Sequence, residues 1–173
     1  REACDGVEVL GGKLYYVGGF KNGTKYNIAE RYDPATNQWE TLQPMNVARS
    51  SVGAAVLDGK LYAIGGSGSA GIEIYDPQTG QWSSGQALPS AVINATSITV
   101  AGKILQIGGD DGVQNLSHVY EFDPGPGQWT SKTPMPTARH GHKLVLLDGK
   151  VWALGGKDGT ATAKVEIYDP IAD

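Results

Sequence analysis

The sequence holds two closely spaced histidines, His140 and His142, which are the residue type most often used in catalysis and metal binding. Residues two apart in an extended strand point to the same side, so the two rings are expected on one face. A catalytic zinc usually has three protein ligands, and the only other histidine is His118. We therefore expect a structural role for His142 and neither a metal site nor a cofactor.

Two arginines occupy equivalent positions relative to a repeated pair of glycines. Arg49 and Arg139 each stand 16 residues before such a pair. A guanidinium group binds a carboxylate through two parallel hydrogen bonds, so these residues suit an acidic peptide or protein ligand. A salt bridge to a neighbouring loop is the alternative. The corresponding positions of the other repeats hold Glu2 and Val92, so the arginines do not form a continuous basic ring.

Three short polar segments follow the glycine pairs and contain Asn22, Asp111 and Asp158, each directly before a glycine. Asn-Gly and Asp-Gly favour tight turns. Loops held by a rigid scaffold often carry binding residues, so these three remain candidate contacts. Asp110 and Asp111 could serve as acid and base, but adjacent loop carboxylates are usually solvated. No nucleophile, base and orienting group fall together, and we assign no catalytic residue.

Composition narrows the class of protein. The 173 residues include 25 Gly and 9 Pro, which excludes a helical bundle, while 40% hydrophobic and 18% charged residues indicate a globular chain. A net charge of −4 without a basic cluster disfavours nucleic acid. No apolar run is long enough for a membrane helix. The single cysteine, Cys4, cannot form an internal disulfide, so a soluble cytoplasmic or secreted location stays open.

A fourfold internal repeat organises the whole chain. Each copy has an apolar string ending in a double glycine, then an aromatic-Asp-Pro triplet, and in the first three copies a tryptophan seven residues after the triplet aromatic. The double glycines begin at Gly18, Gly65, Gly108 and Gly155, and the tryptophans are Trp39, Trp82 and Trp129. The approximate units are 1–43, 44–86, 87–133 and 134–173, which we treat as one domain spanning 1–173.

Each unit contains the pattern of four short antiparallel strands. Asp58-Gly59 and Asp148-Gly149 separate two apolar runs, which is a strong hairpin signal. The third run alternates polar and apolar residues, and the fourth carries the tryptophan. Four such strands in about 45 residues are typical of a β-propeller blade. We expect the tryptophans to pack between blades and the glycines to supply positive φ and close blade contacts.

These markers together resemble the kelch-repeat β-propellers, whose units also have a basic residue near the start and a Glu before Tyr-Asp-Pro. The resemblance implies an all-β, kelch-type propeller with four repeats of four-stranded antiparallel blades. The last blade lacks its outer, tryptophan-bearing strand, so the chain forms a four-bladed ring, a part of a larger ring, or half of a ring that another chain completes. Uncovered blade faces would then favour a homo-oligomer.

The leading functional interpretation is a non-catalytic module that binds a protein or peptide, an acidic one being favoured, on its loop face and channel mouth. In kelch-like recognition domains arginines at this motif position commonly point into the binding bowl. The expected contacts are Arg49, Arg139, His140, Asn22, Asp111 and Asp158, with the arginines near one rim of the ring.

The alternative is an enzyme on the same scaffold. Kelch-like propellers include sugar epimerases and metal-dependent oxidases. A copper radical site needs a cysteine cross-linked to a tyrosine, and Cys4 is badly placed for that because it lies beside a terminus. The enzyme reading therefore has less support than the binding module.

Overall fold

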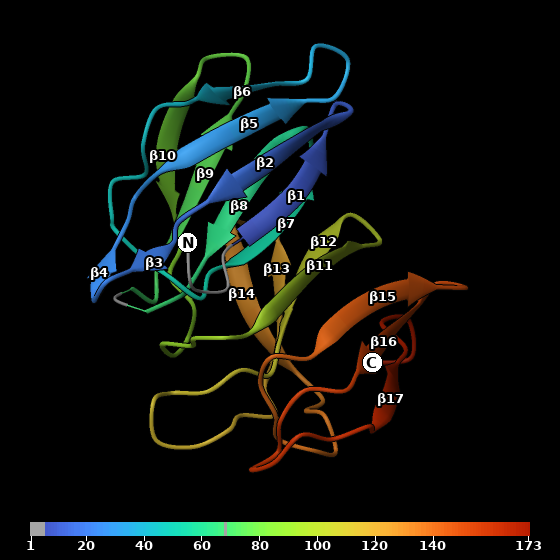
Figure 1. The fold of residues 1–173 in the computed structure, drawn as a ribbon. Helices are drawn as coiled ribbons and strands as arrows, with labels where there is room; N and C mark the ends of the chain where they lie inside the picture. The colour runs from blue at the N-terminus through green and yellow to red at the C-terminus, as the bar shows by residue number, and fades with distance from the viewer. Residues whose placement is uncertain (1–5, 68) are drawn as a thin grey trace.

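The computed structural model of the chain describes residues 6–67 and 69–173. These residues form strands, turns and loops, and none of them forms a helix that could cross a membrane. Four separate antiparallel sheets are stacked side by side (Figure 1), which confirms the propeller predicted from the repeats. We call them blades 1 to 4 in chain order.

Blades 1 to 3 have four strands and blade 4 has three, as the repeat pattern predicts. In each blade the first strand is innermost and the following strands lie progressively outward in chain order. Blade 1 comprises β1 (Gly6–Leu10), β2 (Lys13–Val17), β5 (Ala29–Asp33) and β6 (Gln38–Thr41); blade 2 comprises β7 (Gly53–Leu57), β8 (Lys60–Ile64), β9 (Ile72–Asp76) and β10 (Gln81–Gly85); blade 3 comprises β11 (Thr96–Val100), β12 (Lys103–Ile107), β13 (Val119–Asp123) and β14 (Gln128–Lys132); blade 4 comprises β15 (Lys143–Leu147), β16 (Lys150–Leu154) and β17 (Val165–Tyr168).

A further two-stranded ribbon, β3 (Phe20–Lys21) and β4 (Thr24–Lys25), projects from the loop after β2. The insertion lies in the connection whose length varies most among the repeats. Extra residues are therefore accommodated outside the blade sheet.

Two-residue turns fix the register of the inner hairpins. Asp58 and Gly59 have φ values of 49° and 72°, and Asp148 and Gly149 have 52° and 73°. Two consecutive positive φ values define the hairpin turn whose twist matches that of its strands. Leu57 consequently pairs with Lys60, and every apolar position of β7 and β8 is assigned to one face or the other.

Successive blades bury their apolar faces against one another. The inner strands contact in the order β1, β7, β11, β15. Between blades 2 and 3, for example, Ile64 and Ile72 pack against Ile104, and all three are at most 1% exposed. Similar clusters join blade 1 to blade 2 and blade 3 to blade 4.

The double glycines allow the chain to pass between blades at close range. Gly109 has a φ of 98°, and a Cβ atom there would lie 2.6 Å from the carbonyl oxygen of Ile93. Gly156 has a φ of 97°, and its Cβ would lie 2.7 Å from the carbonyl oxygen of His140. No other residue fits such a position without strain, which confirms the structural role expected for these pairs.

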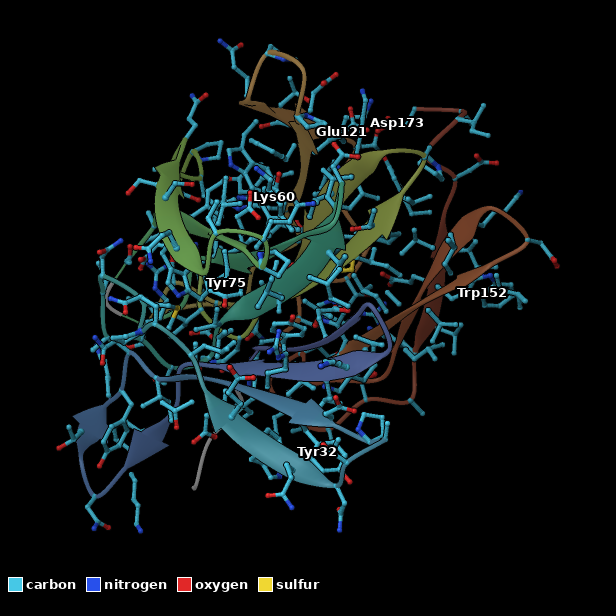
Figure 2. The ribbon with its side chains drawn as sticks, turned by 90° about the horizontal axis from the view of Figure 1, so that it is seen from above. Tyr32, Lys60, Tyr75, Glu121, Trp152 and Asp173 are labelled. Carbon is cyan, nitrogen blue, oxygen red and sulfur yellow. The ribbon has the colours of Figure 1, made fainter. Side chains whose placement is uncertain are left out.

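The two end blades leave apolar faces exposed. On blade 4, Trp152 lies on the side facing away from blade 3 (Figure 2). The residues around Trp152 are at the same repeat positions as the blade 2 residues that blade 3 covers. They are Val145, Leu147, Leu154, Val165 and Ile167, between 36% and 53% exposed. On blade 1 the exposed apolar side chains are Val7, Val9 and Trp39.

The tryptophans confirm the expectation of packing between blades at only two of three positions. Trp129 is 9% exposed, and Trp82 packs against the cluster between blades 1 and 2. Trp39 is 55% exposed, because the face of blade 1 on which it lies has no neighbouring blade among the described residues. The prediction was wrong for Trp39, since the repeat pattern records the strand position and not whether a neighbour covers it.

This difference in burial predicts that a Trp→Ala substitution lowers the free energy of unfolding by different amounts at the two positions. Trp129→Ala removes a buried indole and should lower the free energy of unfolding by about 3–5 kcal/mol. Trp39→Ala should cost less than about 1 kcal/mol, as expected for a surface position. Urea denaturation followed by far-ultraviolet circular dichroism measures both, and equal costs would contradict the packing described.

Candidate functional site

The first residues of the four innermost strands line a central channel of about 300 Å³. Its walls carry small or polar side chains such as Ala54, Thr96 and Ser97, together with Glu8 and Lys143. Burial raises the pKa of the Glu8 carboxyl. Val7, Val52 and Ala95 also line the channel, so its wall carries both apolar and polar side chains.

Three equivalent residues form the channel mouth: Ser51, Asn94 and Gly141. Each has a left-handed backbone, with φ values of 56°, 54° and 64°. The Asn94 amide donates to the Ser51 carbonyl at 3.3 Å, and the Gly141 amide donates to the Asn94 carbonyl at 3.2 Å. The mouth is therefore a chain of backbone hydrogen bonds that runs from blade to blade.

A shallow depression of about 490 Å³ lies beside this mouth, on what we call the loop face, the end of the propeller formed by the loops after the double glycines. His140 Nδ1 shares a 2.7 Å hydrogen bond with Asn115 Oδ1, and Asn94 Nδ2 donates to Asp110 Oδ2 at 2.7 Å. Val113, 94% exposed, also lines the depression. These side chains come from the inter-blade linkers and the loop 110–118, so they meet only in the folded propeller.

Of the other loop candidates, Asp111 and Asp158 lie near this depression and Asn22 lies away from it. Asp111 Oδ1 accepts the amides of Val113 and Gln114 at 2.9 Å and 2.8 Å, and these bonds lower its pKa. Asp158 pairs with Lys164 Nζ at 3.0 Å and directly precedes Gly159, which lines the depression. Asn22 lies at the tip of the separate β3–β4 ribbon, with a φ of 51°.

Arg49 does not lie on the rim as expected from the sequence, because its side chain is 1% exposed. Its Nη2 donates to Glu73 Oε1 at 2.7 Å, and its Nη1 donates to the carbonyls of Gly65 and Gly71 at 3.0 Å and 2.8 Å. Its backbone carbonyl meanwhile accepts the Gly19 amide of blade 1 at 3.0 Å. Arg49 therefore joins blade 1 to blade 2 from the inside.

Arg139 repeats the arrangement between blades 3 and 4, and it too is buried rather than on the rim. Its side chain is 0% exposed and donates to Glu166 Oε2 at 3.1 Å and to the carbonyls of Ala153 and Lys164 at 3.2 Å and 3.1 Å. The Gly109 amide of blade 3 donates to the Arg139 carbonyl at 2.9 Å. In this conformation neither arginine can touch a surface ligand.

The third repeat changes both members of the pair. Val92 takes the arginine position and Tyr120 the glutamate position, and both are buried in the cluster between blades 2 and 3. The Tyr120 hydroxyl instead forms hydrogen bonds with Ser90 Oγ and His118 Nδ1 at 3.0 Å and 2.9 Å. An apolar contact thus replaces the ion pair in this repeat. This supports a structural role for the Arg–Glu ion pairs of the second and fourth repeats.

His142 is buried between blades 3 and 4 and does not share a site with His140. Its ring lies against the backbone of Gly108, and neither ring nitrogen has a hydrogen-bond partner within the described part of the chain. Burial and the nearby Arg139 charge lower its pKa to about 4. Among residues 6–67 and 69–173, no three His, Cys, Asp or Glu side chains gather as metal ligands would.

Sequence reasoning identified His140 but did not combine it with its neighbours Asn94, Asn115 and Val113. Asn94 and Asn115 lie far apart in the third repeat and His140 lies in the fourth, so no local motif connects the three. Their positions in the repeat could have found them. Asn94 and His140 lie in linkers that precede an inner strand, and Asn115 and Val113 lie in the loop after the third double glycine, one of the two longest such connections.

Comparison with known proteins places this geometry in a family. Residues 6–173 match the family described as the KLHDC2/KLHL20/DRC7 Kelch-repeats domain. The chain belongs to this kelch-repeat family. Similar relatives are the Kelch-like ECH-associated protein 1A of Danio rerio, 46% identical over 70 residues, and the Kelch-like protein 35 of Mus musculus, 43% identical over 63 residues.

Each of these kelch alignments covers a small part of both proteins. The first spans 37% of this chain and 12% of the relative, and the second spans 36% and 11%. The kelch fold is thus shared along this chain, whereas the activities and partners of the longer relatives remain matters for proposal.

The buried arginines predict a loss of stability on substitution, opposite to what a rim position implies. Arg49→Met leaves Glu73, only 3% exposed, without its charge partner, and should cost about 3–5 kcal/mol. The matched control is Lys13→Met, which breaks the surface pair between Lys13 and Asp33 and should cost at most about 1 kcal/mol. Chemical denaturation at pH 7 checks both, and a cost below that of the control would contradict the buried pair.

The buried His142 predicts a stability that falls as the pH falls. Its folded pKa of about 4 is below the ordinary 6.5, so between these values the unfolded chain binds the extra proton. Lowering the pH from 6.5 to 5 should cost about 1.5 kcal/mol through this group. His142→Val introduces the residue type that blade 2 has at the same repeat position, Val52. The variant should lose this contribution to the pH dependence of the free energy of unfolding, and an unchanged pH dependence would contradict the prediction.

Proposed function

We propose that this kelch propeller is a non-catalytic protein-binding module whose loop face takes an extended peptide or loop of a partner. The observation that carries the proposal is the depression beside the channel mouth. It presents hydrogen-bonding groups from Asn94, Asn115 and His140 around one fully exposed apolar side chain, Val113. Rigid walls with a few polar groups and an apolar contact suit peptide recognition.

The family supports the same class of function. Its named relatives are Kelch-like proteins, and a binding role for this chain is an inference from that membership together with the loop face. The buried arginines remove the reason for expecting an acidic ligand. The polar side chains that line the depression are amides, the His140 ring and the Asp110 carboxylate, so we propose a polar ligand segment that donates hydrogen bonds.

We also propose that the exposed faces of blades 1 and 4 mediate association with a second copy of the chain. The exposed residues of blade 4 are at the same repeat positions as the blade 2 residues that pack against blade 3. The exposed residues of blade 1 are at the same repeat positions as the blade 2 residues that face blade 1. The two faces are thus the two halves of the interface already formed three times within the molecule. Apolar faces of this kind favour association.

Selection of a peptide library on the immobilised protein tests the loop-face proposal. A selected peptide should bind the double variant Val113→Asp, His140→Ala roughly tenfold or more weakly, because binding energy concentrates in a few central contacts. Ile171→Asp is the matched control, since Ile171 is 86% exposed and lies in the turn after β17, at the opposite end of the blade. Equal affinity for the double variant, or a loss in the control, would contradict the site.

A further inference from the structure

The hydrogen bond between His140 and Asn115 determines which nitrogen of the ring carries the proton. Asn115 Nδ2 donates to the carbonyl of Lys157 at 3.3 Å, so the other end of the amide, Oδ1, faces His140 Nδ1 at 2.7 Å. An amide oxygen can only accept a hydrogen bond, so Nδ1 must carry a proton and donate it. In a neutral histidine the second nitrogen, Nε2, is then an acceptor. His140 Nε2 has no hydrogen-bond partner among residues 6–67 and 69–173.

Asn94 and Asp110 also leave acceptors for a ligand. Asn94 Nδ2 donates to Asp110 Oδ2 at 2.7 Å, so Asn94 Oδ1 is left as an acceptor. Asp110 Oδ1 accepts the Gly112 amide at 3.0 Å, and each carboxylate oxygen can accept a further hydrogen bond. The side-chain donor groups of Asn94, Asn115 and His140 therefore already bind protein acceptors. The depression is thus richer in unused acceptors than in unused donors.

The Asp110 carboxylate adds a negative charge to these acceptors. Asp158, on the neighbouring loop, pairs with Lys164 at 3.0 Å. Asp110 and the exposed Asp111 have no such cationic partner within the described part of the chain. Lys157 is exposed, but it is not among the residues that line the depression. The depression therefore combines a carboxylate without a counter-charge with neutral acceptors.

We propose that this depression takes the side chain of an arginine from the partner segment. A guanidinium group has five N–H donors and no acceptor, which matches a surface of acceptors with a negative charge. Its nitrogens would donate to the Asp110 carboxylate, Asn94 Oδ1 and His140 Nε2. Its aliphatic stem would lie against Val113. The inference rests on the loop-face function proposed above and names the side chain that the loop face recognises.

Other side chains match the same surface less well. A carboxylate would bring further acceptors and a second negative charge next to Asp110. A serine hydroxyl or a primary amide would donate hydrogen bonds but would not balance the charge. A lysine would balance the charge through a compact ammonium group, which lacks the planar fork of donors that can reach several acceptors at once. Arginine is the side chain that satisfies both requirements.

Two small probes that differ in charge test the site on the 173-residue chain. They are N-acetyl-arginine-N-methylamide and its citrulline analogue, in which an oxygen replaces one guanidinium nitrogen and the charge is lost. Nuclear magnetic resonance follows the side-chain amides of Asn94 and Asn115 and the ring of His140 during titration. The arginine probe should shift these signals to saturation, and the citrulline probe should bind about tenfold or more weakly, because charged hydrogen bonds are lost. Equal affinities, or no shift of these signals, would overturn the proposal.

A substitution of the carboxylate isolates the contribution of its charge. Asp110→Asn keeps the shape of the side chain and should weaken binding of the arginine probe about tenfold or more, with citrulline binding unchanged. The matched control is Asp148→Asn, which removes an exposed carboxylate from the β15–β16 turn at the opposite end of blade 4. The control should change the binding of neither probe. An equal effect of the two substitutions on arginine binding would contradict the proposal.

The peptide selection described above distinguishes a failure of this inference from a failure of the proposed function. Peptides that bind the loop face should contain an arginine, and their affinity should fall in the Asp110→Asn variant. Loop-face binders that lack arginine and bind this variant equally well would overturn the inference and leave the binding function standing. Binding of the arginine probe without any loop-face peptide would support the arginine site and contradict the wider function.

Discussion

The burial of apolar blade faces against one another is the constraint on which this structure depends. A four-stranded sheet with apolar residues on both sides cannot be stable alone, so each blade needs a neighbour. Leu61 on one side of blade 2 and Ile64 on the other are both 0% exposed. The loop face, the channel and the candidate binding depression exist only because this stacking fixes the linkers between blades.

Polar interactions determine where each linker lies once the faces are stacked. The ion pairs of Arg49 with Glu73 and of Arg139 with Glu166 join linker to blade, and Trp82 and Trp129 do the same from the outer edge. Buried ion pairs add little net stability, but loss of one partner is costly because it leaves a buried charge without a counter-charge. The third repeat, with Val92 and Tyr120 instead, shows that the blade interface accepts an apolar solution at the same position.

Much of the fold follows from the sequence, because repeated markers at constant spacing define strands, turns and blade order. The apolar runs before Asp58-Gly59 and Asp148-Gly149, for example, are the strands β7 and β15. The site was less accessible to prediction. Arg49 was expected on the rim because its place in the chain is at a strand entry, and only three-dimensional packing shows that its side chain turns inward to Glu73. Asn94 and Asn115 meet His140 through blade stacking, which no local pattern encodes.

Sedimentation velocity of the chain over a range of concentrations tests most directly whether each apolar blade face must pack against another blade. The account predicts reversible self-association that increases with concentration, because Leu147 is 51% and Ile167 is 53% exposed on one end face and Val9 is 61% exposed on the other. Leu147→Glu together with Ile167→Lys should restore a monomer without loss of the circular dichroism signal. A chain that remains monomeric at every concentration would contradict the claim.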